Sequence, residues 1–276
     1  MNSLLISILT MGILGAFFSY ALSIAQKKLK VEEDPRIDEV EEALPNANCG
    51  GCGYPGCRAF AEAVVAGKAE PNGCPVGGNE TAAAVSKILG VEVVEKEREV
   101  AVLMCRGTNE AAKRKAKYRG VDTCYGAALV QQGDKFCTYG CLGLGDCVDA
   151  CDFDAIHIKE EGIPIIDREK CTGCGQCVIA CPRDLLELHP VSKTYFVYCK
   201  SHDDPKTSRK NCNNACIACS LCVRGVKEGE IVMDNFLAIV KDHSVVENEE
   251  AMKWAAKCPT KAIGDLKNYD EYKDQF

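Results

Sequence analysis

Cysteine is the residue that could carry the chemistry of this chain, because 20 of its 276 residues are cysteine. The densest group is Cys171-Thr-Gly-Cys174-Gly-Gln-Cys177-Val-Ile-Ala-Cys181-Pro182. This C-x2-C-x2-C-x3-C-P spacing is that of bacterial 4Fe–4S sites, in which three cysteines bind one cluster and the fourth binds its neighbour. The group therefore predicts one-electron redox chemistry at two adjacent clusters.

The partners of this group are expected just before it in the chain, at Cys137, Cys141, Cys147 and Cys151. Swapped pairing predicts two ligand sets. One set is Cys151, Cys171, Cys174 and Cys177, and the other is Cys137, Cys141, Cys147 and Cys181. The second set departs from the simple spacing, because Cys141 and Cys147 stand in C-x5-C with no cysteine between them, so Cys137 is taken as the substitute.

Two short β-branched runs lie between these groups. Residues 155–158 and 163–166 flank Glu160-Glu161-Gly162, a pattern that predicts a β-hairpin covering the clusters.

A separate cysteine group lies nearer the N-terminus, in Asn48-Cys-Gly-Gly-Cys-Gly-Tyr-Pro-Gly-Cys57 followed by Cys74-Pro75. The glycines allow the positive φ and the close backbone approach that a loop around a cluster needs. We expect Cys49, Cys52, Cys57 and Cys74 to hold a third 4Fe–4S cluster, with a helix over 58–66 returning the chain to Cys74. A four-thiolate zinc site is the alternative, although zinc sites usually pair two C-x2-C knuckles.

The C-terminal part of the chain repeats the pattern in decayed form. The cysteines at 124, 137, 141 and 147 recur 75 residues later as Cys199, Cys212, Cys216 and Cys222. Val226 replaces the equivalent of Cys151, and the triplet Cys171, Cys174 and Cys177 has no counterpart. We therefore expect one cluster here, making four 4Fe–4S clusters in all. Its ligands would be Cys216, Cys219, Cys222 and Cys258.

Four cysteines are left without a cluster, namely Cys105, Cys124, Cys199 and Cys212. Buried free thiols are one interpretation. A further metal site is the other, and it would reopen the assignment of Cys137.

The cysteine groups follow an apolar N-terminus, since the first 26 residues carry no charge. The stretch from Leu4 to Ala25 is long enough as a helix to cross a bilayer. Lys27, Lys28 and Lys30 come after it, which argues against a signal peptide and predicts a cytoplasmic body held at the cytoplasmic membrane by a single span. Thiols stay reduced in that compartment, which favours metal binding over disulfides.

Charge is uneven along the chain, whose net value is −7. An acidic run at 38–42, after Pro35, predicts a solvated linker. Between Cys105 and Cys124 the sequence instead has six basic and two acidic residues. This segment is either a solvated face or a docking surface for an acidic redox partner. The basic residues are Arg106, Lys113, Arg114, Lys115, Lys117 and Arg119.

Other functions find little support. The sequence has neither G-x-G-x-x-G after a strand nor a P-loop, so no NAD, FAD or ATP site is expected in this chain. Acidic balance and few aromatic residues argue against nucleic acid as a partner.

These features predict an α+β protein with an N-terminal transmembrane helix at 1–26 and a linker at 27–46. A small helical 4Fe–4S domain would cover 47–90 and a connecting segment with the basic patch 91–130. A two-cluster ferredoxin-like module would follow at 131–192, and a degenerate one-cluster module at 193–276.

In combination, the span, Ala47-Asn-Cys-Gly-Gly-Cys-Gly-Tyr-Pro-Gly-Cys57 with Cys74-Pro75, and Cys137-Thr-Tyr-Gly-Cys-Leu-Gly-Leu-Gly-Asp-Cys147 resemble the long form of the B subunits of Rnf complexes. The resemblance implies an enzyme subunit that takes electrons from reduced ferredoxin. It would pass them to other membrane subunits of a ferredoxin:NAD⁺ oxidoreductase that translocates Na⁺ or H⁺. Two other functions stay open: a subunit of another membrane oxidoreductase, and a membrane-tethered zinc scaffold. In the redox interpretation, electrons enter the C-terminal modules and leave through the Cys49 group.

Overall fold

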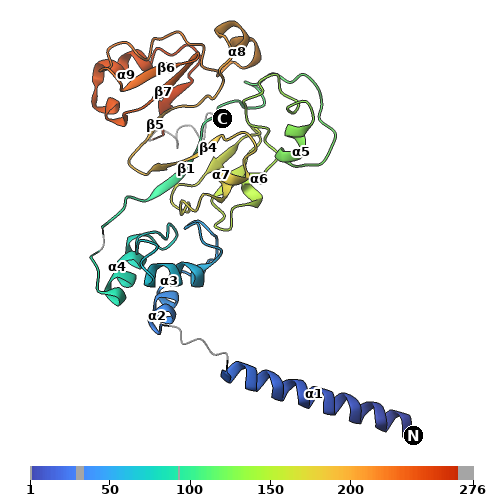
Figure 1. Ribbon diagram of the computed structural model, residues 1–276. Helices are drawn as coiled ribbons and strands as arrows, with labels where there is room; N and C mark the ends of the chain where they lie inside the picture. Colours follow the sequence, from blue (N-terminus) through green and yellow to red (C-terminus); the bar gives the residue numbers. More distant parts are fainter. Residues whose placement is uncertain (1, 29–33, 93, 267–276) are drawn as a thin grey trace.

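The computed structural model describes residues 2–28, 34–92 and 94–266, with the side chains of 2–5 and 27 left out. The side chain of Lys27, and all of Lys30, therefore lie outside the described residues. Helix α1 (Asn2–Lys28) projects away from the rest of the chain in Figure 1. Its residues Ile6–Gln26 have a mean hydropathy of 1.9 and are wholly unburied, so they are apolar and long enough to span a membrane.

Three helices form the small domain that follows: α2 (Arg36–Ala43), α3 (Cys57–Val65) and α4 (Gly78–Leu89). The predicted helix after Cys57 is confirmed by α3. The acidic run differs from the expected linker, because α2 packs against α3 and α4. Val40 and Leu44 are buried in the domain core with Phe60, and this apolar stripe outweighs the charge on the exposed face of α2.

The first ferredoxin-like module is built from two antiparallel strand pairs. Strand β1 (Glu99–Leu103) pairs with β4 (Leu186–Pro190) and joins the two ends of the module. Strands β2 (Ile156–Ile158) and β3 (Pro164–Ile166) form the predicted hairpin, which is confirmed. The helices of the first module are α5 (Cys124–Leu129), α6 (Asp146–Asp149) and α7 (Gln176–Ala180). The range 91–130, expected to be a connecting segment, thus supplies an edge of this module.

The second module repeats that topology. Strand β5 (Tyr195–Val197) pairs with β8 (Ile263–Asp265), and β6 (Ile231–Asp234) pairs with β7 (Leu237–Val240). Helix α8 (Pro205–Asn211) precedes the inner hairpin, and η1 (His243–Glu247) and α9 (Glu249–Ala255) follow it. Each module places its loops at the ends of short strands, where the cysteines lie.

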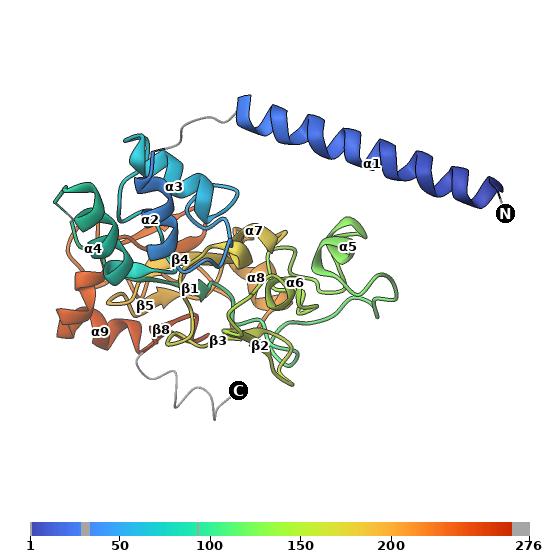
Figure 2. The same cartoon turned by 90° about the horizontal axis from the view of Figure 1, so that it is seen from below.

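The parts follow one another in space as they do in sequence. Figure 1 shows α1, then the helical domain, the first module and the second module, and Figure 2 shows the helical domain on the α1 side of the body. The two modules are in direct contact. The Arg106 guanidinium lies 3.8 Å from the centre of the Tyr198 ring, and its Nη1 donates to the Lys261 carbonyl at 2.9 Å.

Candidate metal centres

The first module brings together the predicted set Cys151, Cys171, Cys174 and Cys177, which lines one cavity. The Ala101 N–H points at the Cys171 Sγ at 3.4 Å, so strand β1 contributes a hydrogen bond to this site. Gly173 has a φ of +72°, and a Cβ there would lie 2.5 Å from the Glu99 carbonyl oxygen. The loop can therefore approach β1 only because residue 173 is glycine.

The second predicted set of this module is only partly assembled. Cys141, Cys147 and Cys181 line a common cavity, but the fourth cysteine beside them is Cys124, not Cys137. Cys124 begins α5, and the Asp146 carboxylate accepts from its backbone N–H at 2.6 Å. This contact ties α5 to α6, the helix that holds Cys147. The structure thus differs from the expected set, because Cys124 lies beside these three cysteines and Cys137 lines another cavity.

Sequence spacing alone did not reveal Cys124, because its offset of 75 residues pairs it with Cys199. In the fold, Cys199 follows strand β5 as Cys105 follows β1. The first module is longer between these landmarks, with 32 positions from Cys105 to Cys137 against 13 from Cys199 to Cys212. Cys124 lies in that extra length, and the signal for it was the missing middle cysteine at Leu144.

The second module gathers its four predicted cysteines around one cavity. These are Cys216, Cys219, Cys222 and Cys258. Cys219 is exposed while Cys216 and Cys222 are buried. Its neighbours Ala218 and Ser220 both have positive φ, near 50°, which turns the chain tightly around this position. One side of this set therefore reaches the protein surface.

In the helical domain, Cys52, Cys57 and Cys74 pack against the core formed by the three helices. The Gly77 N–H donates to the Cys74 Sγ at 3.4 Å. Cys49 lies at the side facing the first module, where its carbonyl accepts from the Gln176 Nε2 at 2.6 Å. The structure thus places this set at the boundary between the two domains.

Three of the four cysteines without a predicted cluster also come together. Cys105, Cys199 and Cys212, together with Cys137, line a cavity between the two modules. With the predicted set of Cys49, Cys52, Cys57 and Cys74, the four cavities account for all 20 cysteines.

Burial affects the free thiols strongly. It raises the pKa of Cys147, Cys177 and Cys222 to about 12, because an ionised sulfur is poorly solvated there. Metal ligation removes the proton from a thiol. Within the described residues, no three His, Cys, Asp or Glu side chains converge as one metal ion would require. The cavities suit a larger group bound by four thiolates, as a 4Fe–4S cluster is.

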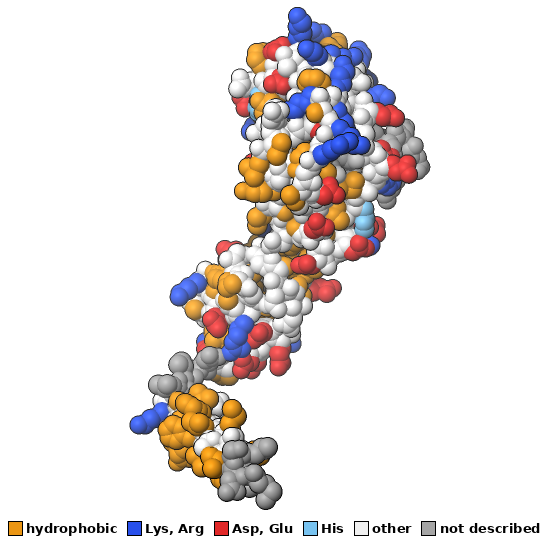
Figure 3. Space-filling view, turned by 90° about the vertical axis from the view of Figure 1, so that its right-hand side faces the viewer, with side chains coloured by type: hydrophobic (Ala, Val, Ile, Leu, Met, Phe, Trp, Pro, Cys, Tyr) orange, Lys and Arg blue, Asp and Glu red, His pale blue; other side chains and the backbone are white. Residues whose placement is uncertain are grey.

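The basic segment is partly a surface feature. Arg106 is buried against Tyr198 and is not available for docking. Residues 113–117 and Arg119 are exposed, and the Lys113 N–H donates to the Asn211 carbonyl at the end of α8. Helix α8 adds exposed Lys206, Arg209 and Lys210. Figure 3 shows Lys and Arg side chains gathered at the end of the body farthest from α1.

Comparison with known families agrees with two of these sites. Residues 44–76 match the family described as Putative Fe-S cluster, and residues 164–187 match the 4Fe-4S binding domain family. The first range contains the whole Cys49 to Cys74 group, and the second contains the C-x2-C-x2-C-x3-C-P run.

Curated relatives extend the similarity to nearly the whole chain. The B subunit of the Na(+)-translocating ferredoxin:NAD(+) oxidoreductase complex of Acetobacterium woodii is 42% identical over 96% of this chain and 79% of that protein. The B subunit of the ion-translocating oxidoreductase complex of Methanosarcina acetivorans is 41% identical over 95% of this chain and 99% of that protein. In Clostridium ljungdahlii, the B subunit of the proton-translocating ferredoxin:NAD(+) oxidoreductase complex is 39% identical, over 95% of this chain and 93% of that protein.

This chain belongs to the family of Rnf B subunits. As a member it is an iron–sulfur protein of a membrane complex that has other subunits, and α1 is its candidate membrane span. The α+β fold expected from the sequence is confirmed, with iron–sulfur domains after one apolar helix.

Proposed function

We propose that this Rnf protein carries electrons from ferredoxin toward the membrane. It would do so as a subunit of an ion-translocating ferredoxin:NAD⁺ oxidoreductase. Reduced ferredoxin docks on the end of the body farthest from α1, and electrons move along the cysteine sets toward the Cys49 group beside the membrane. The observation that carries this proposal is the spatial order of the domains, which leads from the second module, where Cys219 is exposed, through the first module to the helical domain and α1.

Four of the sets are proposed to hold 4Fe–4S clusters. They are Cys49, Cys52, Cys57 and Cys74; Cys151, Cys171, Cys174 and Cys177; Cys124, Cys141, Cys147 and Cys181; and Cys216, Cys219, Cys222 and Cys258. When bound, such clusters supply one-electron transfer, while the protein sets their spacing and potential. The chain's own contribution is therefore to hold thiolates in place, donate hydrogen bonds to sulfur and exclude water.

Contact between the helical domain and the first module supports the last part of the route. Gly51 lies against the Cys174 backbone, so that a Cβ added there would be 2.7 Å from the Cys174 carbonyl oxygen. Together with the hydrogen bond from Gln176 to Cys49, this packing keeps the Cys49 and Cys174 loops adjacent. Inside the first module, Cys147 and Cys177 share one buried core.

The charge of the distal surface supports docking of an acidic ferredoxin. Lys117 and Arg119 lie in the exposed loop, and Arg209 and Lys210 lie on α8, whose C-terminus leads into Cys212. Complementary charge raises the rate of encounter between redox partners. A donor bound there would be close to the second module.

The cysteine-bearing body is proposed to lie on the cytoplasmic side of the membrane. Lys28 ends α1 on the side from which the body extends, which is the orientation that the positive-inside rule favours. Translocation of Na⁺ or H⁺ would then be the task of the membrane subunits that receive the electrons.

Removing the Cys49 group tests the proposed direction. A Cys52→Ala/Cys57→Ala variant should abolish turnover of the membrane complex while ferredoxin still reduces the distal clusters, as followed by EPR. Circular dichroism and iron content verify that the variant is folded. If the distal clusters also stay oxidised in the folded variant, electrons do not enter where we propose.

A further inference from the structure

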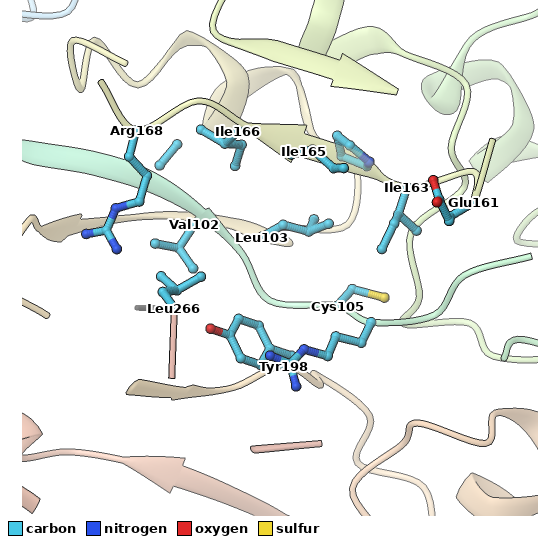
Figure 4. Close-up of a pocket in the computed structure, with 13 residues that line it drawn as sticks. Val102, Leu103, Cys105, Glu161, Ile163, Ile165, Ile166, Arg168, Tyr198 and Leu266 are labelled. Carbon is cyan, nitrogen blue, oxygen red and sulfur yellow. The ribbon is translucent and has the colours of Figure 1, made fainter. Parts of the chain in front are cut away.

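The cavity between the modules is lined by four cysteines that come in equivalent pairs. Cys105 and Cys137 belong to the first module, and Cys199 and Cys212 to the second. Cys105 follows strand β1 and Cys199 follows strand β5, each by two residues. Figure 4 shows Cys105 beside Tyr198, the residue that precedes Cys199 in the second module. Equivalent cysteines of the two modules thus line one cavity.

Backbone hydrogen bonds to these sulfurs follow the same symmetry. The Gly107 N–H donates to the Cys105 Sγ at 3.3 Å, and the Ser201 N–H donates to the Cys199 Sγ at 3.5 Å. The Cys141 N–H also donates to Cys105, as the Cys216 N–H does to Cys199. Cys105 and Cys199 therefore each accept hydrogen bonds from two backbone N–H groups at equivalent positions of their modules. N–H groups aimed at cysteine sulfur stabilise thiolates and are among the features that tune iron–sulfur sites.

A buried cation accompanies the cavity. Lys135 is fully buried, and its Nζ donates to the carbonyls of Gly107 and Cys141 at 2.9 and 2.7 Å. In the part of the chain that the structure describes, no carboxylate pairs with it. A buried ammonium without a counter-charge is costly. The positive charge of Lys135 is felt by the thiol of Cys141, in the neighbouring set, and by that of Cys212, in this cavity. Thiolates bound to iron would supply the missing negative charge.

We propose that Cys105, Cys137, Cys199 and Cys212 hold a fifth 4Fe–4S cluster between the two modules. This inference rests on the proposed function of the other four sets as cluster sites. It is favoured over four free thiols because free thiols need neither symmetric N–H donors nor a buried lysine. It is favoured over zinc because these cysteines line a cavity and do not converge on one point.

A cluster at this position would close a gap in the electron route. Cys105 packs with Cys141 and Cys181 of the neighbouring set, and Cys199 packs against Cys216 of the second module. The sets containing Cys216, Cys105, Cys141, Cys177 and Cys49 then form one uninterrupted row. Each step is a one-electron exchange in which the donor cluster is oxidised, the acceptor cluster is reduced, and no bond is made or broken.

Metal analysis of the full chain, purified in detergent without oxygen, tests the proposal. We expect about twenty iron atoms with matching acid-labile sulfide and no zinc. A Cys212→Ala variant should lose about four of each, and a matched Cys219→Ala variant should lose about four from a different site. The double variant should therefore lose about eight.

Other outcomes separate the two proposals. About sixteen irons in the wild-type chain, unchanged by Cys212→Ala, would overturn the fifth cluster while leaving the other four sets intact. Sixteen irons plus one zinc that disappears in Cys212→Ala would also overturn it, since the cavity would then be a zinc site. Zinc without iron in the wild-type chain would instead refute the proposed function itself. The wild-type count decides the matter even if a variant fails to fold.

Discussion

The two ferredoxin-like modules share a topology but differ in what fills them. The first has two cysteine sets of its own, around Cys177 and around Cys147. In the second, the place of the first set is taken by apolar side chains, with Val226 where Cys151 would recur. Val245, on η1, is fully buried there, and Ala251 on α9 packs beside it. The same small scaffold thus encloses a cysteine-lined cavity in the first module and an apolar core in the second.

The two modules also complete their retained sites differently. In the second, Cys219 is the middle cysteine of a C-x2-C-x2-C run. In the first, Leu144 occupies that position, and Cys124 on α5 comes from a distant part of the chain. Leu144 packs against the apolar cluster that contains Cys124. We propose that Cys124 completes this set, in which no middle cysteine is present at position 144.

The largest effect is expected from a substitution in the first module, which contains two cysteine sets. Cys177→Ala should remove about four irons and stop electron flow to the Cys49 group. Cys177 shares a buried core with Cys147, and the Cys174 loop of the same set packs against the loop of Cys49. Iron analysis and complex turnover measure the two effects. Turnover at the wild-type rate would mean that the route bypasses this set.

Giving the first module the cysteine spacing of the second tests the role of Cys124. Cys124→Ala should lose about four irons, and Cys124→Ala/Leu144→Cys should regain them, since the second substitution recreates the spacing that Cys219 has in the second module. Iron and sulfide content measure this rescue. Leu144→Cys alone is the control and should change neither. Loss of iron in Cys124→Ala without rescue would show that position 144 cannot face the cluster.

Charge reversal should have a smaller effect. Lys117→Glu/Arg119→Glu should slow reduction by ferredoxin about tenfold at low salt and less at high salt. Lys68→Glu/Lys87→Glu, at two exposed positions of the helical domain, makes the same change in net charge and is the matched control. Stopped-flow mixing measures both rates. Equal slowing by the control would assign the effect to net charge and not to the loop.

The smallest effect is expected from a substitution in the apolar core of the second module. Val245→Ala should destabilise the second module by about 2 kcal/mol, because it removes two buried methyl groups. Iron content should remain unchanged. Denaturant unfolding followed by circular dichroism measures the loss of stability. Loss of iron would mean that this core also supports the Cys216 set.

Local spacing predicted much of the fold and of the sites. The span, the helix after Cys57 and the hairpin before Cys171 follow from short-range patterns, and the structure agrees with them. The pairing of β1 with β4 could not be read in this way, because it joins residues nearly ninety positions apart. The position of Cys124 beside Cys141, and the cavity that Cys105 shares with Cys199, could not be read from local spacing for the same reason. Both depend on the packing of the modules, whereas sequence offset pairs Cys124 with Cys199, which lines a different cavity.

We predict that electrons from ferredoxin reach the Cys49 group along the row of cysteine sets. Rapid-freeze EPR of the full chain, mixed without oxygen with reduced ferredoxin, tests it most directly, with a Cys74→Ala variant identifying the N-terminal signal. We predict that this signal appears after the distal signals in the wild-type chain and is absent from folded Cys177→Ala. Its appearance at the wild-type rate in Cys177→Ala would contradict the account.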